Sequence, residues 1–194
     1  NVNAKKTFGY IFGTAEAAGC TSVTSNYNTS GSLTSYIPSS LTEVTVNYAE
    51  GSVLPEYAFN KVTTLEKVVL TGVVGIGKNA FEGCSSLDFA VIYNCYTHNV
   101  NDASNMFKGC TSMKSLDVRD FEFDKDINVS GMFDDCVNFS SIECKPDLIK
   151  IVASNLPTRP FTHPGEIKLR RGDIFMTPEL YDELTTECDE ELLI

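Results

Sequence analysis

The sequence lacks most of the features that mark an enzyme or a metal protein. It has no tryptophan and two histidines, His98 and His163, neither of which has a partner at the spacing of a metal site or a catalytic triad. No nucleophile elbow, metalloprotease motif or phosphate-binding loop appears. The seven cysteines include no C-x-x-C pair, which disfavours a zinc ribbon or a thioredoxin-type site. We therefore expect no catalytic residue, no cofactor and no metal, and we predict that the chain is not an enzyme.

Basic residues are scarce as well. The 15 Lys and Arg residues stand against 26 Asp and Glu residues, which gives a net charge of -11. A nucleic-acid partner would need a basic surface to face its phosphates, so we expect none. Seven of the acids lie in residues 177–194, where there is no base, so the acidity is mostly a C-terminal feature.

Long apolar runs are missing too. The longest candidate, Val68–Gly77, is interrupted by glycine and falls far short of the ~20 residues that cross a bilayer, so we expect no membrane insertion. The sequence starts at Asn1 without a charged and then apolar leader. We expect that any secretion signal has been removed or precedes this sequence.

What the sequence does contain is a repeat. Cys84, Cys110 and Cys136 follow one another at intervals of 26 residues, which is typical of stacked structural units. A small or thioether residue followed by Phe recurs at spacings of 22, 26 and 26, as Ala58-Phe59, Ala80-Phe81, Met106-Phe107 and Met132-Phe133. Three further apolar columns follow: Leu65, Leu87, Met113 and Phe139; Val68, Ala90, Leu116 and Ile142; Leu70, Ile92, Val118 and Cys144.

These columns predict an α/β solenoid in which short strands alternate with short helical or turn segments. We call each unit a rung and count about five, led by Leu41, Leu65, Leu87, Met113 and Phe139. A unit of this length cannot bury its apolar residues alone, so neighbouring rungs must stack on one core. We expect the four aligned Phe residues to form one aromatic spine. The cysteine column favours buried, unreactive free thiols, with disulfides between adjacent rungs as the alternative.

The same residues resemble a known family. Asn79–Leu87 is similar to the leucine-rich repeat of BspA-like bacterial surface proteins, with its Ala-Phe, Cys and Ser-Leu elements. Ser104–Cys110 and Ser130–Cys136 are similar to a sister repeat of those proteins that has a Met-Phe-x-x-Cys core. The resemblance covers about residues 37–144, and the sequence departs from it at Asn60-Lys61-Val62 and at the bulky Phe139. It implies an extracellular, surface-displayed leucine-rich-repeat module associated with adhesion and protein binding.

We predict one continuous domain in three parts. Residues 1–36 form an irregular N-terminal segment packed on the array, and residues 37–144 form the leucine-rich repeats. Residues 145–194 form a C-terminal helical cap: a helix from Pro146, a strand over Gly165–Leu169 and an acidic helix from Thr177.

A candidate protein-binding surface follows from strand alternation. If the apolar columns point inward, the residues between and beside them point outward. Three outward residues of one rung are apolar or aromatic, which is unusual for a free surface. The candidate surface comprises Lys67, Val69, Phe89, Val91, Tyr93, Asp117 and Arg119. The alternative is that the N-terminal segment, through Tyr10, Ile11 and Phe12, covers this surface.

A further motif has an ordinary interpretation. Asp124–Ser130 begins like a calcium loop, but Val129 replaces the required glycine and Asp135 the terminal glutamate, so we expect a polar bend between rungs. Two functions remain. The first is a non-catalytic adhesion or binding module for a host or bacterial surface protein, or for a second copy of the chain. The second is a structural spacer within a longer surface or fibre protein.

Overall fold

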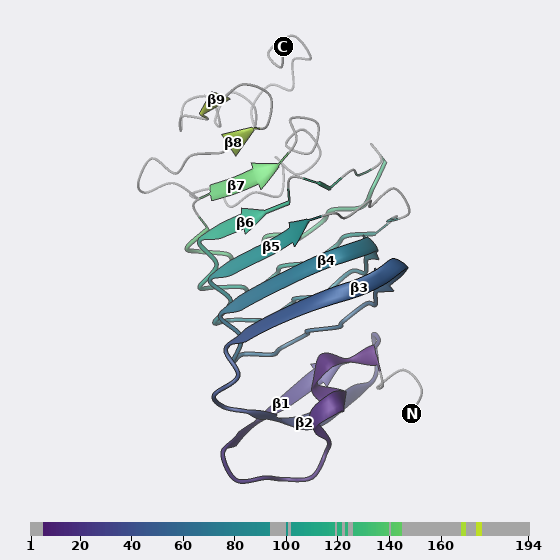
Figure 1. Ribbon diagram of the computed structural model, residues 1–194, viewed down its shortest axis with the longest axis vertical. Coiled ribbons are helices and arrows are strands. Elements are labelled where there is room, and N and C mark those ends of the chain that lie inside the picture. Colours follow the sequence, from purple (N-terminus) through teal and green to yellow (C-terminus); the bar gives the residue numbers. More distant parts are fainter. Residues whose placement is uncertain are drawn as a thin grey trace.

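The computed structural model describes residues 6–93, 100, 102–118, 120–121, 123, 126–139, 141–144, 168–169 and 174–175. A short 3-10 helix, η2 (Phe8–Phe12), precedes an antiparallel hairpin of β1 (Cys20–Asn26) and β2 (Ser32–Pro38). A second sheet has seven strands in chain order (Figure 1). They are β3 (Glu43–Leu54), β4 (Lys67–Ile76), β5 (Phe89–Tyr93), β6 (Ser115–Asp117), β7 (Ser141–Cys144), β8 (Lys168–Leu169) and β9 (Ile174–Phe175).

The second sheet stacks the repeats in register. Each strand from β3 to β7 pairs in parallel with the next one along the chain, and β8 pairs antiparallel with β9. The register places the expected columns side by side. One is Val44, Val68, Ala90, Leu116 and Ile142, and another is Val46, Leu70 and Ile92. The members on β4 to β7 are at most 2% exposed, so these strands present one face to a common core.

The second side of each rung is a tight turn. The backbone N–H of Phe59 donates to Ala80 O at 2.7 Å, and that of Phe81 donates to Met106 O at 2.9 Å. Amides that bond to the next rung cannot also bond within a helix. Of the helical or turn segments that we expected between the strands, the described rungs have turns, and no α-helix occurs among the described residues.

The aromatic spine is confirmed. Phe59, Phe81, Phe107 and Phe133 lie in parallel stacks with successive ring centroids 5.3, 5.3 and 5.9 Å apart. The rings are at most 2% exposed. Phe8 of η2 continues the stack beyond Phe59, with its centroid 4.8 Å away. The spine therefore joins the N-terminal segment to the repeats.

The cysteine column consists of buried free thiols, as we expected, and the adjacent-rung disulfide is not formed. Each S–H donates to a phenylalanine carbonyl of the preceding rung: Cys84 to Phe59 O at 3.0 Å, Cys110 to Phe81 O at 3.2 Å and Cys136 to Phe107 O at 3.1 Å. Burial raises the pKa of Cys84 and of Cys136 to about 12, so these thiols are poor nucleophiles.

The N-terminal segment is more ordered than we predicted. Residues 20–38 form the hairpin β1–β2 instead of an irregular cover, and the boundary predicted at residue 37 falls inside β2. Val23, Ser25, Ser35 and Ile37 alternate toward its buried face. The expectation failed because small polar residues occupy half of that face, so the hydrophobic alternation is weak.

The hairpin and η2 cover the first turn of the array. Phe8 N–H donates to Ala58 O at 2.6 Å, and Asn26 N–H donates to Asn60 Oδ1 at 2.7 Å. Ser25 Oγ donates to Asn60 O at 2.5 Å. These groups donate hydrogen bonds to backbone carbonyl and side-chain amide oxygens at the end of the array. No preceding rung is present there to supply such donors.

The expected C-terminal cap falls largely outside the described residues. β8 lies within the predicted strand Gly165–Leu169, and β9 adds one further strand to the sheet. Both expected helices lie outside the described part of the chain.

Candidate binding face

The register of β4 and β5 brings most of the candidate residues together. Lys67 lies opposite Phe89, Val69 opposite Val91, and Thr71 opposite Tyr93. All six belong to the outer rows of the two strands, because the residues between them are the buried inner columns. We call Val69, Phe89, Val91 and Tyr93 the outer patch.

The outer patch is accessible to solvent to different degrees. Tyr93 is 39% exposed, while Val69, Phe89 and Val91 are half-buried. The three half-buried residues occupy neighbouring positions in the register of the two strands, and Tyr93 stands at the end of β5. Such a surface offers an apolar centre with one exposed aromatic residue, which is the composition of many interaction sites.

The predicted polar rim is only partly present. Lys67 Nζ lies 3.9 Å from Glu43 Oε2, and both side chains are exposed, so this ion pair contributes little to stability. Asp117 was predicted to face solvent, but it is 8% exposed. Alternation fixes only which face of the sheet a residue occupies, and Asp117 is flanked in register by Val91 and Glu143. Arg119 lies outside the described residues.

The alternative in which the N-terminal segment covers the patch was wrong. Phe8 packs against Phe59, and a Cβ on Gly9 would lie 2.9 Å from Ser35 Cβ, so η2 sits against the first turn and β2. Figure 1 shows η2 on the side of β3 that faces away from β4. Tyr10, Ile11 and Phe12 are 38%, 69% and 37% exposed, and the ring of Phe12 packs edge-on against Phe8.

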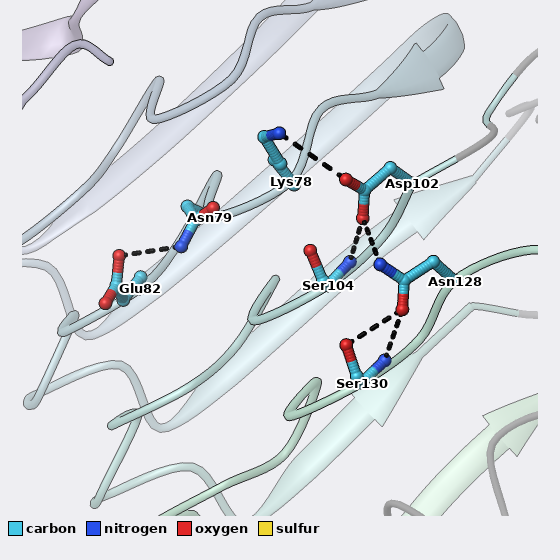
Figure 2. A network of polar contacts seen from close by, with 7 residues as sticks. All are labelled: Lys78, Asn79, Glu82, Asp102, Ser104, Asn128 and Ser130. Carbon is cyan, nitrogen blue, oxygen red and sulfur yellow. Dashed lines mark hydrogen bonds and ion pairs between the residues drawn. The ribbon is translucent and has the colours of Figure 1, made fainter. Parts of the chain in front are cut away.

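A polar ladder crosses the edge of the array where strands lead into turns (Figure 2). Asp102 Oδ1 accepts hydrogen bonds from Ser104 N–H at 3.0 Å and from Asn128 Nδ2 at 3.2 Å. Asn128 Oδ1 in turn accepts from Ser130 N–H at 3.1 Å. The loop that resembled a calcium site thus contributes Asn128 and Ser130 to a turn between rungs, as expected of a polar bend.

Lys78 completes this ladder with a charge. Its Nζ lies 3.5 Å from Asp102 Oδ2. Partial burial alone would raise the pKa of Asp102, but the hydrogen bonds from Ser104 and the charge of Lys78 outweigh it and hold that pKa below its usual value. The carboxylate is therefore a fixed, ionised structural group.

Other kinds of site find no support in the described part of the chain. No group of three or more His, Cys, Asp or Glu side chains there is arranged to hold a metal ion. The same part of the chain also has no helix with the length and apolar character that crossing a membrane requires.

The repeats identify the family. The family model described as BspA type leucine rich repeat region, with six copies, matches residues 52–156, which is just over half of the chain. The chain therefore belongs to the BspA-type leucine-rich repeat family. No curated protein and no solved structure matches it.

A cavity between the hairpin and the ends of β3 and β4 was not predicted from the sequence. Its lining includes Gly75 of β4, Glu56, and Tyr27 in the turn between β1 and β2. The two glycines Gly75 and Gly77 within an otherwise apolar strand pattern were a signal of close backbone approach that could have pointed to it.

Proposed function

We propose that this chain is a non-catalytic protein-binding module that acts outside the cell, and that it binds its partner through the outer patch. The observation that carries the proposal is the juxtaposition of Val69 and Val91 with Phe89 and Tyr93 on the outer face of two paired strands. The neighbouring rungs place polar residues at the matching outer positions, namely Thr45 on one side and Ser115 on the other.

Several further features support this reading. Leucine-rich repeats commonly serve as rigid platforms for other proteins, and BspA-type repeats are typical of bacterial surface proteins. We infer in addition that the stacked rungs form an open solenoid, closed at its C-terminal end by a cap within residues 145–194. The partner is a host or bacterial surface protein or a second copy of this chain.

The test replaces the two aromatic residues of the outer patch. The Phe89→Ser/Tyr93→Ser variant should lose binding to the proteins captured by the native chain on an array of purified surface and matrix proteins, and should lose any self-association seen by sedimentation. Its free energy of unfolding should change by less than about 1 kcal/mol, because neither side chain belongs to the core.

A matched control removes apolar surface elsewhere. Ile11→Ser/Val137→Ser changes two side chains that are each 69% exposed and lie away from the outer patch. This control should bind as the native chain does. Equal loss in both variants would show that binding follows general hydrophobicity, and a large drop in the stability of the aromatic variant would show that the patch is core. A chain that captures no protein would favour the spacer role.

A further inference from the structure

A cavity lies at the junction between the hairpin and the repeats. Its volume is about 700 Å³, within the usual range of binding pockets. The lining comes from the turn between β1 and β2, from the ends of β3 and β4 with the residues that follow them, and from residues 6, 100 and 102. No residue of the outer patch contributes to this lining, so the two are separate surfaces.

The charged groups of the cavity balance one another. Two lysines line it, Lys6 and Lys78, and so do two acids, Glu56 and Asp102. This balance contrasts with the net charge of -11 of the whole chain. A charged ligand of either sign would meet like and opposite charges in equal number, so electrostatic attraction would not select it. The lining therefore favours a ligand without net charge.

The polar groups of the lining offer both donors and acceptors. Lys78 Nζ lies 3.5 Å from Asp102 Oδ2, so these two charges already neutralise each other (Figure 2). Lys6 and Glu56 are exposed, and neither forms an ion pair within the described part of the chain. Asn28 also lines the cavity, and its Oδ1 accepts a backbone hydrogen bond of 3.0 Å. An ammonium group, a carboxylate and a carboxamide can therefore bond to one ligand.

An aromatic ring is held beside these polar groups. Tyr27 lines the cavity and is half-buried. Its N–H donates to Gly31 O at 3.0 Å and closes the turn. A Cβ at Gly31 would lie 2.6 Å from Tyr27 Oη, which is too close for a real contact, so the ring packs directly over the glycine. A ring that is already positioned loses little conformational entropy when a ligand packs against it.

The segment that carries this ring is uncharged. Residues 17–42 contain no Asp, Glu, Lys or Arg, and hydroxyl and amide side chains predominate among them. Thr29 and Ser30 are exposed in the turn itself. This side of the cavity can therefore contact a polar neutral molecule without removing water from a charge.

We propose that the cavity is a binding site for a neutral saccharide, which packs the C–H face of one ring on Tyr27 and bonds its hydroxyl groups to Lys6, Glu56 and Asn28. A hydroxyl group both donates and accepts, so one sugar can satisfy an ammonium group, a carboxylate and a carboxamide together. An apolar ligand would displace water from these groups without replacing its hydrogen bonds. The competing ligand is a zwitterionic dipeptide, which could pair with both exposed charges but has no ring to cover the tyrosine.

The experiment is a titration of the isotopically labelled chain with disaccharides, followed by amide NMR shifts. At least one of four neutral probes, namely lactose, cellobiose, maltose and N,N′-diacetylchitobiose, should bind saturably and shift the amides of residues 27–31, 56 and 76–78. Deacetylated chitobiose, which is cationic, and sialyllactose, which is anionic, should bind no more tightly than their neutral counterparts. Glycyl-glycine should cause no saturable shift at these amides.

Three variants locate the binding. Tyr27→Ala should weaken the tightest neutral probe about fivefold, because the ring contact is lost. Gly31→Ala should weaken it to a similar degree, since the new Cβ would displace the ring, and it keeps the test valid if Tyr27→Ala disturbs the hairpin. Glu56→Gln should weaken the probe about threefold, because a hydroxyl group bonds less strongly to a neutral amide than to a carboxylate.

Thr24→Ala is the matched control. Thr24 is exposed on the same hairpin and lies outside the lining, so this variant should bind the probe as the native chain does. The Phe89→Ser/Tyr93→Ser variant should also bind the probe unchanged, since the outer patch is a separate surface.

Four outcomes would overturn the proposal: no saturable shift at these amides with any neutral disaccharide, tighter binding of a charged sugar than of its neutral counterpart, saturable binding of glycyl-glycine at the same amides, or an affinity that Tyr27→Ala and Gly31→Ala both leave unchanged. None of these outcomes bears on the outer patch, whose own test uses whole proteins.

Discussion

The first turn of the array and the turns that follow it share one backbone but differ in chemistry. Tyr57 and Lys61 have φ values of 59° at the two ends of the first turn, and Asn79 and Gly83 have 58° and 74° in the second. The later turns carry a cysteine whose S–H meets the preceding rung, whereas the first has Val62. The first turn also buries Asn60, at a position where the second carries the half-buried Glu82.

The difference reflects what lies on each side of the turn. A turn between two rungs accepts hydrogen bonds from the preceding rung and donates them to the next one, so a repeated set of residues suffices. The first turn has the hairpin on one side, and Asn60 fits that setting by bonding in both directions. It accepts from Asn26 N–H at 2.7 Å and donates to Glu82 O at 3.2 Å. A departure from the repeat pattern here marks the place where a different structure docks.

The largest expected effect is on the aromatic spine, where a central ring should contribute more to the free energy of unfolding than a ring at the end. Phe107→Ala should lower the free energy of unfolding by about 3–5 kcal/mol, because rungs on both sides prevent the cavity from collapsing. Phe59→Ala should cost at least about 1 kcal/mol less, since Phe8 on a short N-terminal segment can move into the space. Urea unfolding of both variants measures the two costs. A loss below about 1 kcal/mol for Phe107→Ala would contradict the spine as the main stabilising column.

A second prediction tests the docking role of Asn60. Asn60→Ala should destabilise the chain by about 1–3 kcal/mol, because it leaves the partly buried backbone N–H of Asn26 without its acceptor. Hydrogen exchange should show loss of protection concentrated in β1 and β2. Lys108→Ala, at the equivalent position of the third turn, is the control and should leave exchange in the hairpin nearly unchanged, because Lys108 pairs with Asp134 and not with Asn60. Uniform loss across all rungs in Asn60→Ala would mean that the hairpin and the array unfold as one unit.

The array could be predicted from the sequence, whereas its ends and its exposed surface could not. The spacings of Phe59, Phe81 and Phe107 specify which residues stack, because each rung repeats the same backbone path. The hairpin was not predicted because Ser25 and Ser35 are buried although they are polar. A hydrophobic pattern therefore does not mark these positions as facing the core. Asp117 was misjudged because alternation predicts the face of a sheet and not its exposure. The cavity is lined by residues of the hairpin and of three rungs, and no local pattern records that these segments come together.

A third prediction uses the thiols that the later turns have and the first turn lacks. An unfolded cysteine loses its proton near pH 9, while burial keeps Cys84 and Cys136 protonated up to about pH 12. The unfolded state therefore binds fewer protons above pH 9, and the free energy of unfolding falls as pH rises, by about 1.4 kcal/mol per thiol per pH unit. Below pH 9 the same thiols should cause no pH dependence.

The matching variant gives the later turn the residue of the first. Cys84→Val copies Val62 and should reduce the slope of stability against pH between pH 9 and pH 11 by one thiol's share. Denaturant unfolding at several pH values in the presence of a reductant measures the slope. An unchanged slope would show that other groups govern the alkaline loss.

The smallest expected effect comes from a substitution that makes the first turn resemble the second. Lys61 has a left-handed backbone where the second turn has Gly83, and this conformation costs a residue with a side chain roughly 1–2 kcal/mol. Glycine removes that cost but adds about 0.5–1 kcal/mol of chain entropy, so Lys61→Gly should stabilise the chain by about 0.5 kcal/mol. The reverse change, Gly83→Ala, should destabilise by more. Its Cβ would be strained by the φ of 74° and would also lie 3.0 Å from Lys61 Cγ. Paired urea unfolding curves resolve the two signs. A loss of stability in Lys61→Gly would show instead that the contact of the Lys61 side chain with Gly83 outweighs the backbone strain.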